Sequence, residues 1–332
     1  MRWTAATKIA QPLPCPNTPG DAIMLHIAFA GLGKMGRPIA RHLAQKGDPK
    51  QQRITAFDLD VSRSTGPATP GLAVTNNRDA LNGAEMLFVC LPDGEVVERA
   101  LFGDGGLAAR LAPGAIVVDL STIQHAKTLE IGQALKAKGM RFLDCPVSGA
   151  PAGAEAGTLT VICGGDAETF AAAKPLRARF STNVLHMGPL GSGQLTKTVN
   201  NVIYDINIAA LAEVLPMAVA MGLDPEKLAT VVTTGTSRSF ASEYFVPRIL
   251  KGLFDEGYPL GKAYKDLVSC AAICTEQTFP MPVTAAATAT YQTALRQGHG
   301  DRDKGAMILP FEALLGVKVR ARESTASERT PD

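Results

Sequence analysis

The stretch LHIAFA, Leu25–Ala30, runs directly into Gly31-Leu32-Gly33-Lys34-Met35-Gly36, and a helix-like segment follows at residues 38–44. A largely apolar run of this length predicts a buried parallel strand. Residues 38–44 carry their apolar side chains at helical spacing, which predicts a helix. The three glycines therefore occupy the turn between a strand and a helix, and this context decides the fold.

The glycine turn has the spacing Gly-x-Gly-x-x-Gly, in which each glycine has a separate task. Gly31 permits the tight turn, Gly33 lets a pyrophosphate approach the backbone, and Gly36 lets helix and strand pack closely. The N-terminus of the following helix holds an anion. A plain strand-to-helix turn is the alternative, but the flanking elements favour a dinucleotide-binding site. We assign to it Gly31, Leu32, Gly33, Lys34, Met35 and Gly36.

The composition is that of an ordinary globular protein. The chain has 332 residues, of which 46% are hydrophobic and 19% are charged. This length predicts about two domains. The formal net charge of +2 gives no reason to expect nucleic acid or an anionic membrane surface as a partner. We therefore expect small-molecule chemistry.

The six cysteines predict reduced thiols rather than a metal site. They form no Cys-x-x-Cys pair, and no histidine cluster accompanies them. Cys270 and Cys274 are four residues apart and could share a helix face, but reduced core or interface thiols are the expectation. The longest uncharged segment, residues 277–295, contains two prolines, so we expect no membrane span. These features predict a cytoplasmic protein.

Short apolar runs alternate with helix-like stretches between residues 24 and 187, which predicts βαβ units and a parallel sheet. After Gly193 the pattern changes to helical periodicity. Residues 194–221 predict one long helix that Gly222 ends. Asp224-Pro225-Glu226 predicts the start of the next helix. Beyond Leu25–Ala30, strands are predicted at residues 53–57, 84–91, 115–120, 140–145, 158–163 and 183–186.

The predicted fold class is α/β, a doubly wound parallel sheet followed by an all-α domain that a long helix joins to it. Residues 1–23 lack the apolar segment of a signal peptide. We therefore expect them to be a disordered extension, or the result of a translation start assigned too far upstream. Residues 24–188 predict the dinucleotide-binding domain. Residues 189–319 predict an all-helical domain for substrate and oligomerisation, and residues 320–332 a flexible tail.

Asp58 ends the predicted second strand, where an acidic side chain can accept hydrogen bonds from ribose hydroxyls. A polar insert at residues 47–52 explains why Asp58 lies further from Gly31 than the usual ~20 residues. The carboxylate would repel a 2′-phosphate, which favours NAD over NADP, although Arg63 weakens that preference. An aspartate that caps the next helix is the alternative.

Three further segments fall at the carboxyl ends of predicted strands, where open α/β sheets bind ligands. Leu91-Pro92-Asp93 and Ser121-Thr122 follow two of these strands, and each could be an ordinary turn. Residues 144–153 are rich in Gly, Ala and Pro and expose backbone amides. Within them Ser148 offers a hydroxyl and Gly149 an unobstructed amide, which together suit a small carboxylate.

Lys197 and Asn201 lie four residues apart near the start of the predicted long helix, so both project from one face. Apolar residues that include Leu195 and Val199 lie on another face. A helix N-terminus and burial in a cleft both lower the pKa of a lysine, which can then act as a general base near neutral pH. A solvated surface lysine is the alternative.

Taken together, these motifs resemble those of the β-hydroxyacid dehydrogenase family. The resemblance runs from about residue 24 to residue 315 and keeps several independent motifs in order. It implies a Rossmann domain joined by a long helix to an all-α domain, assembled as a homodimer or homotetramer through the helical part. The matching motifs are the glycine turn, Leu91-Pro92, residues 119–122, residues 144–157, residues 191–201 and Lys265-Asp266.

The resemblance also implies a role for each site residue, and none of them for a metal. Lys197 is implied to be the catalytic lysine. Thr122 is implied to lie beside the nicotinamide ribose, and Lys265 to reach back to the cofactor. The implied substrate residues are Ser148, Gly149, Ala150, Asn201 and Ser121. The implied cofactor residues beyond the glycine turn are Asp58, Leu91, Pro92, Val96, Thr122 and Lys265.

Two residues depart from the family pattern, since Ala150 stands where glycine is usual and Cys145 replaces a common alanine. Neither change removes a functional group. The sequence therefore predicts a dehydrogenase that uses NAD, or alternatively NADP, to oxidise a small 3-hydroxy acid such as 3-hydroxyisobutyrate or glycerate. The rival hypotheses are a dinucleotide-binding protein without turnover and an imine reductase on the same fold. We expect Ser239, Phe240 and Tyr244 to contribute to the pocket wall.

Overall fold

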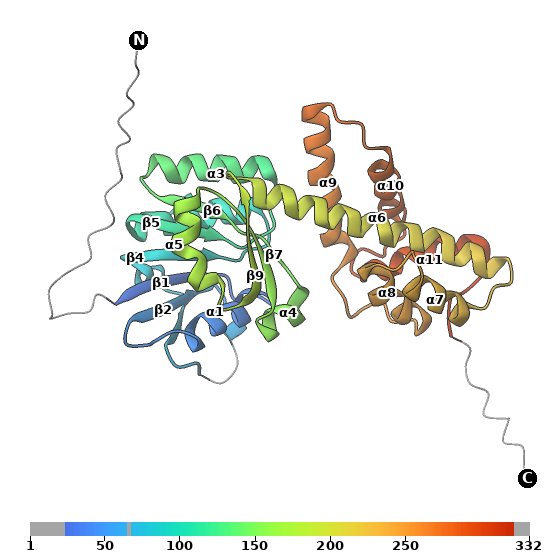
Figure 1. Ribbon diagram of the computed structural model, residues 1–332, viewed down its shortest axis with the longest axis horizontal. Coiled ribbons are helices and arrows are strands. Elements are labelled where there is room, and N and C mark those ends of the chain that lie inside the picture. Colours follow the sequence, from blue (N-terminus) through green and yellow to red (C-terminus); the bar gives the residue numbers. More distant parts are fainter. Residues whose placement is uncertain (1–23, 65–67, 322–332) are drawn as a thin grey trace, which may run out of the picture.

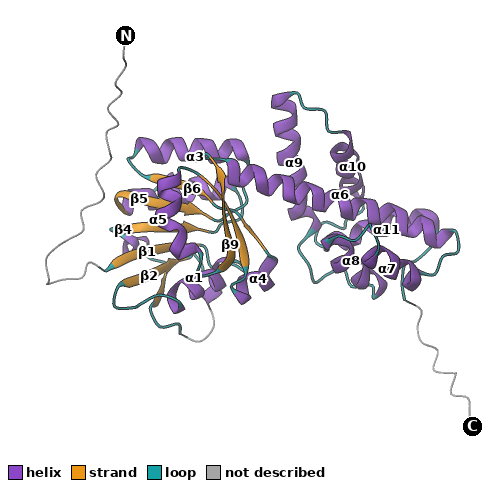
Figure 2. Cartoon of the chain, viewed as in Figure 1, coloured by secondary structure: helices purple, strands orange, loops and turns teal. Residues whose placement is uncertain are grey.

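The computed structural model describes residues 24–64 and 68–321, in two parts that the long helix α6 (Ser192–Ala220) joins (Figure 1). The N-terminal part is a sheet with helices and the C-terminal part is helical (Figure 2). This arrangement confirms the predicted fold class. The predictions for residues 1–23 and 322–332 lie outside the described residues, as does the side chain of Arg63.

Within the described residues, nine strands form one sheet in the order β3-β2-β1-β4-β5-β6-β8-β7, with β9 paired to β8. The chain winds outward from β1 in one direction and from β4 in the other. Open α/β sheets bind ligands where the direction of winding reverses, at the carboxyl ends of the strands. The strands are β1 (Leu25–Ala30), β2 (Gln52–Phe57), β3 (Leu72–Thr75), β4 (Ala84–Val89), β5 (Leu111–Asp119), β6 (Arg141–Asp144), β7 (Val147–Ser148), β8 (Leu159–Gly164) and β9 (Ser181–Gly188).

Helices cover both faces of this sheet and give it two apolar cores. Phe29 of β1 and Leu43 belong to the core on one face, whereas Ala28 of β1 and Leu135 belong to the core on the other. Neighbouring residues of a strand point to opposite faces, so β1 contributes to both cores. The helices of this part are α1 (Gly36–Gln45), α2 (Gly94–Phe102), α3 (His125–Ala137), α4 (Ala150–Ala156) and α5 (Ala167–Arg177).

The sheet differs from the predicted all-parallel arrangement at one edge. β8 runs antiparallel to both β6 and β7. Between β7 and β8 lies α4, a helix of seven residues, and a parallel return needs a crossover of a dozen residues or more. β3 and β7 were not predicted, because strands of four and two residues are too short to show a periodicity.

Helix α6 confirms the predicted long helix to within two residues at either end. Gly191 and Gly222 flank it with φ angles of +90° and +92°. Its N-terminal end packs against β6, β8 and β9, and the rest of it packs against α7 to α11. Among the described helices it alone is long and apolar enough to cross a membrane, a property that the sequence analysis did not single out. Its contacts with both parts identify it as a core helix.

Five helices and a 3-10 turn complete the helical part around α6. Phe245, Tyr291 and Met307 lie in its core. The predicted start of the second helix is confirmed, because the Asp224 side chain accepts hydrogen bonds from the Glu226 and Lys227 amides. The helices are α7 (Pro225–Thr234), α8 (Phe240–Leu250), α9 (Leu260–Gln277), α10 (Pro282–Arg296) and α11 (Ile308–Leu315), with η4 (Lys304–Met307) before α11.

The predicted start of the flexible tail at residue 320 needs correction. The Arg320 guanidinium donates to the Glu312 carboxylate, with Nη1 2.7 Å from Oε1. It also lies 5.0 Å from the centre of the Phe254 ring. Since Val319 is buried as well, the chain is fixed to the helical part through Arg320.

Candidate active site

The glycine turn joins β1 to α1 at the point where the winding of the sheet reverses. A Cβ atom on Gly36 would lie 1.9 Å from the Gly31 carbonyl oxygen, and one on Gly31 would lie 2.2 Å from the Cys90 carbonyl oxygen. Gly36 is therefore needed for close packing, as predicted, and Gly31, predicted to permit the turn, has a φ angle of +99° and no room for a side chain. A Cβ on Gly33 would meet no atom within 4 Å. Gly33 thus faces open space beside a helix N-terminus, and this arrangement fits the pyrophosphate of a dinucleotide.

Asp58 follows β2 and fixes the glycine turn. Its Oδ2 atom accepts a hydrogen bond of 2.7 Å from the Leu32 amide, and its Oδ1 atom accepts one of 2.9 Å from the Asp60 amide. The side chain is buried. Asp58 therefore lies next to the turn, as the sequence predicts. A carboxylate oxygen can accept more than one hydrogen bond, so ribose hydroxyls remain compatible with these contacts.

Lys265 of α9 connects the helical part to the carboxyl edge of the sheet. Its Nζ atom donates to the Pro92 carbonyl oxygen at 3.0 Å and to the Thr122 carbonyl oxygen at 2.9 Å. Burial lowers the pKa of Lys265, and the charge of Asp266 opposes this. Thr122, Thr198 and Asp266 line a pocket between the two parts at this point. The sequence placed Lys265 and Thr122 in one site, and the structure brings them together.

The segment after β6 contains backbone that only glycine adopts easily. Gly149 has a φ angle of +134° and Ala150 one of +57°. A left-handed conformation costs a non-glycine residue about 1–2 kcal/mol. The usual glycine of the family would relieve this strain at position 150. Ser148 lies in the short strand β7, directly before these two residues.

Lys197 lies one turn into α6 and is 8% exposed. Burial lowers its pKa to about 8, while the negative charge of Asp266 raises the pKa and the positive charge of Lys304 lowers it. Among the described residues, all of these neighbours act through charge and none through a hydrogen bond. The burial of Lys197 excludes the solvated surface lysine.

Asn201 lies on the same face of α6 as Lys197, as predicted. Its Nδ2 atom donates a hydrogen bond of 2.8 Å to Oδ2 of Asp266 on α9. Asn201 is half-buried and Asp266 is 8% exposed. The carboxylate of Asp266 thus fixes the orientation of the amide and supplies a negative charge near Lys197.

Comparison with known proteins matches residues 26–188 to the NAD binding domain of 6-phosphogluconate dehydrogenase and residues 191–311 to the NAD-binding domain of NADP-dependent 3-hydroxyisobutyrate dehydrogenase. A 2-(hydroxymethyl)glutarate dehydrogenase from Eubacterium barkeri is 33% identical over 89% of this chain and 97% of its own length. The chain belongs to the β-hydroxyacid dehydrogenase family. As a family member, it is an NAD(P)-dependent oxidoreductase.

Two further relatives extend the comparison for this β-hydroxyacid dehydrogenase. An NAD-dependent L-serine dehydrogenase from Pseudomonas aeruginosa is 34% identical over 88% of this chain and all of its own length. The structure of a 3-hydroxyisobutyrate dehydrogenase from Mycobacterium tuberculosis, solved with L-serine, has a TM-score of 0.76 and 30% identity. The match covers 86% of this chain and 99% of that one. The relatives therefore share the whole architecture, but their names give different substrates.

Ser121, predicted to be a substrate residue, lies buried beside the Leu91-Pro92 segment of this β-hydroxyacid dehydrogenase. It is 3% exposed, and its Oγ atom accepts a hydrogen bond of 2.9 Å from the Leu91 amide. Ser121 therefore supports the Leu91-Pro92 segment from behind. Val96 lies in the first turn of α2, which Asp93 caps by accepting a hydrogen bond from the Val96 amide.

The sequence analysis did not assign Asp144 and Gln194, which fix the start of α6. The buried Asp144 carboxylate accepts hydrogen bonds of 2.8 Å from the Gly191 and Gln194 amides. The Gln194 side chain donates to the Ser121 carbonyl oxygen at 2.7 Å. An acid that ends a strand was the available signal for Asp144. Its partners lie about 50 residues further along the chain, a distance that no local pattern reveals.

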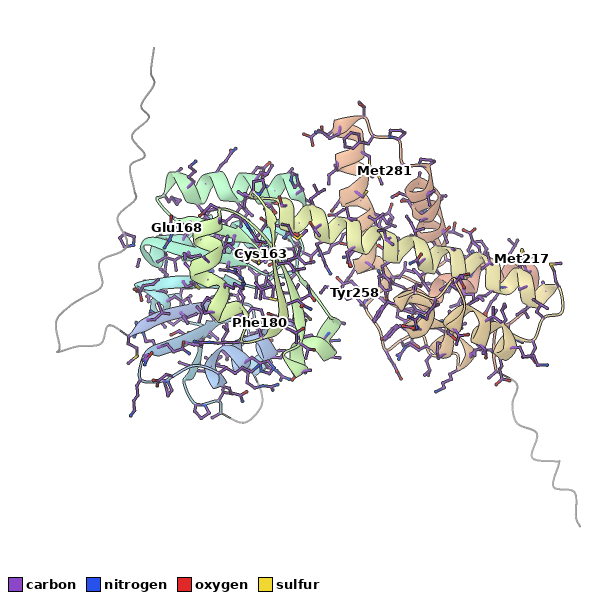
Figure 3. The ribbon with its side chains drawn as sticks, viewed as in Figure 1. Cys163, Glu168, Phe180, Met217, Tyr258 and Met281 are labelled. Carbon is purple, nitrogen blue, oxygen red and sulfur yellow. The ribbon has the colours of Figure 1, made fainter. Side chains whose placement is uncertain are left out.

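The expected pocket-wall residues have mixed surroundings. Ser239 caps α8 through hydrogen bonds with Ser242. Phe240 is exposed and stacks on Tyr244, with ring centres 5.8 Å apart. Tyr258, which was not predicted, lies on the side of the helical part that faces the sheet (Figure 3). Ser239 therefore has a structural role as a helix cap, while the rings of Phe240 and Tyr244 could still line the substrate pocket.

Proposed function

We propose that this protein oxidises a small 3-hydroxy acid, with Lys197 as the general base and NAD as the preferred cofactor. The observation that carries the proposal is the buried Lys197 ammonium group, whose pKa burial lowers to about 8. A general base works best when its pKa lies near the operating pH. The relatives named as dehydrogenases of 2-(hydroxymethyl)glutarate, L-serine and 3-hydroxyisobutyrate all act on such hydroxyl groups.

In this mechanism Lys197 accepts the proton of the substrate hydroxyl group. When bound, the nicotinamide ring supplies the acceptor for the hydride, which leaves the carbon that carries this hydroxyl group. Asn201, whose amide Asp266 orients through the 2.8 Å hydrogen bond, holds the hydroxyl group beside Lys197. In the reverse direction the protonated Lys197 returns the proton to the carbonyl oxygen.

The substrate carboxylate binds to the segment Ser148-Gly149-Ala150. The Ser148 hydroxyl group and the backbone amides of this segment are donors that orient an anion without a basic side chain. Gly149 needs its φ angle of +134° to turn the backbone here. Small acids are favoured because the strained Ala150 adds a methyl group where relatives of this kind usually have none.

The cofactor residues are the glycine turn, Asp58, and the segments around Pro92 and Thr122. Lys265 fixes the latter two segments by its bonds to both carbonyl oxygens. The charge of the buried Asp58 beside the turn favours a ribose with free hydroxyls over one that carries a 2′-phosphate. Relatives use either cofactor, since one is named an NAD-dependent L-serine dehydrogenase and one solved structure holds NADP+. NAD is therefore our preference and NADP the alternative.

A homo-oligomer assembled through the helical part completes the proposal. Leu195, Val199 and Ile203 lie four residues apart along α6 and are 43%, 53% and 56% exposed. A row of exposed apolar side chains on one face of a helix is typical of an interaction surface. Light scattering on the purified protein tests this, and a monomer at micromolar concentration would contradict it.

The activity is tested by a panel of acids with both cofactors. The panel contains 3-hydroxyisobutyrate, glycerate, L-serine, 2-(hydroxymethyl)glutarate and 3-hydroxypropionate, and NADH or NADPH formation is followed by absorbance. We expect turnover of at least one acid, with a higher kcat/KM for NAD. Cofactor binding without turnover of any acid would instead support the non-catalytic dinucleotide binder.

A further inference from the structure

Three sulfur atoms meet where α9 turns into α10. The Sγ atoms of Cys270 and Cys274 lie 3.9 Å apart, and the Sδ atom of Met281 lies 3.1 Å from Cys274 Sγ. Cys270 is 7% exposed, Cys274 is half-buried and Met281 is 43% exposed. The turn projects beyond the rest of the helical part (Figure 1), and Met281 lies at its end (Figure 3). This sulfur cluster of Cys270, Cys274 and Met281 is therefore accessible from solvent.

The backbone brings the three sulfur atoms together in two ways. Cys270 and Cys274 are four residues apart in α9, so their side chains are neighbours on one face of the helix. Thr278 ends this helix with a φ angle of +56°. The Phe279 amide then donates to the Cys274 carbonyl oxygen at 2.9 Å, and the reversed chain returns Met281 to Cys274. The cysteine pair was visible in the sequence, but no periodicity reports the turn that adds the methionine.

The helix prevents the two thiols from forming a disulfide with each other. Cβ atoms at this helical spacing lie about 5–6 Å apart, whereas a disulfide needs Cβ atoms about 3.5–4.5 Å apart. Burial, and then the neighbouring Cys274 thiol, raise the pKa of Cys270 to about 11. Cys270 is therefore a protonated thiol at neutral pH and a poor nucleophile. The pair thus fits neither a disulfide nor a reactive thiolate.

A single soft metal ion fits the two thiols and the thioether. Metal–thiolate bonds measure about 2.3 Å, so one ion can join sulfur atoms up to roughly 4.6 Å apart. Met281 has an unbranched, flexible side chain whose sulfur can adjust to a third ligand position. Thiolate and thioether ligands together favour Cu(I). Structural zinc needs four ligands, and no group of three His, Cys, Asp or Glu side chains in the described part of the chain is placed to hold a metal ion.

We propose that the sulfur cluster binds one Cu(I) ion per chain, with Cys270 and Cys274 as thiolate ligands and Met281 as the thioether ligand. On binding, each thiol exchanges its proton for a bond to the metal. Two protons are therefore released, no electron is transferred, and the occupied site carries one net negative charge. The inference does not depend on the proposed hydride transfer, because none of the three ligands belongs to that site.

The experiment titrates the reduced protein with Cu(I) in the absence of oxygen, in competition with the colorimetric chelator bicinchoninate. X-ray absorption at one equivalent of Cu(I) then counts the sulfur ligands. Wild type should take one ion from the chelator and hold it with three sulfur atoms. Cys274→Ser should lose the ion. Met281→Leu should keep it with two sulfur atoms and a Kd raised by about tenfold.

Two control variants remove sulfur elsewhere in the chain. Cys90→Ser changes another half-buried thiol, and Met217→Leu changes a methionine that is 50% exposed. Both should bind Cu(I) as wild type does. A wild-type Kd in Cys274→Ser would overturn the proposal, as would nitrogen or oxygen ligands on the bound ion or an unchanged sulfur count in Met281→Leu. If a cysteine variant does not fold, Met281→Leu decides, because it keeps the size and apolar character of an exposed side chain.

Discussion

The sheet part and the helical part contribute different groups to the site, backbone in the first and side chains in the second. In the sheet part the site is largely backbone: Gly31 and Gly36 allow close packing, and Gly33 leaves open space beside the turn. In the helical part the site consists of side chains, chiefly Lys197, Asn201 and Asp266, that different helices bring together. Helix α6 connects the two, because its start is fixed to Asp144 and its next turns carry the side chains.

This difference decides how each part responds to mutation. A backbone site depends on the space around each glycine, so an added methyl group acts by collision. A side-chain site depends on charge and hydrogen bonding, so the same methyl group matters little there and the loss of one polar atom matters more. The predictions below test this contrast, from the largest expected effect to the smallest.

Gly36→Ala and Gly33→Ala should separate packing from cofactor approach. At Gly36 the new Cβ atom would lie 1.9 Å from a carbonyl oxygen, so both Tm and NAD affinity should fall. Overpacking lowers the free energy of unfolding by about 1–3 kcal/mol. At Gly33 the new Cβ atom meets no protein atom within 4 Å. The Tm of Gly33→Ala should therefore equal that of wild type, and only its NAD affinity should fall. Calorimetry and cofactor titration measure both, and equal losses of Tm would contradict the contrast.

Asn201→Ala should lower kcat/KM while NAD affinity stays unchanged. The loss of a hydrogen bond to a charged group costs about 1.5–3 kcal/mol, which is roughly 10- to 100-fold in rate. Asn207→Ala on the same helix is the matched control and should keep wild-type kinetics. Steady-state assays with the best acid of the panel decide, and a wild-type kcat/KM in Asn201→Ala would show that the amide does not touch the substrate.

Asp58→Ser should shift the cofactor preference. Removal of the negative charge should raise the ratio of kcat/KM for NADP to that for NAD by about tenfold. The ratio is its own control, because any damage to the turn through the lost bond to Leu32 affects both cofactors. An unchanged ratio would mean that the ribose does not lie against this carboxylate.

Ala150→Gly should stabilise the protein slightly. Relief of the left-handed conformation at φ +57° should raise the free energy of unfolding by about 0.5–1 kcal/mol. Ala152→Gly, in the same short helix but without positive φ, should instead lower it by about 0.5–1 kcal/mol. Urea denaturation of both variants checks the opposite signs, and a loss in both would refute the strain.

The sequence predicted the backbone share of the site better than the side-chain share, for a physical reason. Gly31, Gly33 and Gly36 act within six residues of one another, so their spacing alone carries the information. Lys197 and Asn201 were also accessible, because they are one helical turn apart. The partner that orients Asn201 was not, since Asp266 lies 65 residues beyond it.

The fold followed the same rule. Long periodic elements such as α6 were predicted to within two residues, whereas the two-residue strand β7 and the reversed direction of β8 were missed. Strand direction depends on the length of the connection through α4, which apolar periodicity does not report. The hydrogen bond of Ser121 with the Leu91 amide was also out of reach, because the two residues lie 30 positions apart.

The central claim is that Lys197 exchanges the substrate proton. The most direct test is the rate of hydride transfer in single-turnover experiments from pH 6 to pH 10, in wild type and Lys197→Ala. In wild type, oxidation should rise with pH through a midpoint near the Lys197 pKa of about 8, because only the neutral amine accepts a proton. Lys197→Ala should lose this midpoint and roughly 100-fold or more in rate, with unchanged NAD affinity. A variant that keeps the wild-type rate and pH profile would contradict the account.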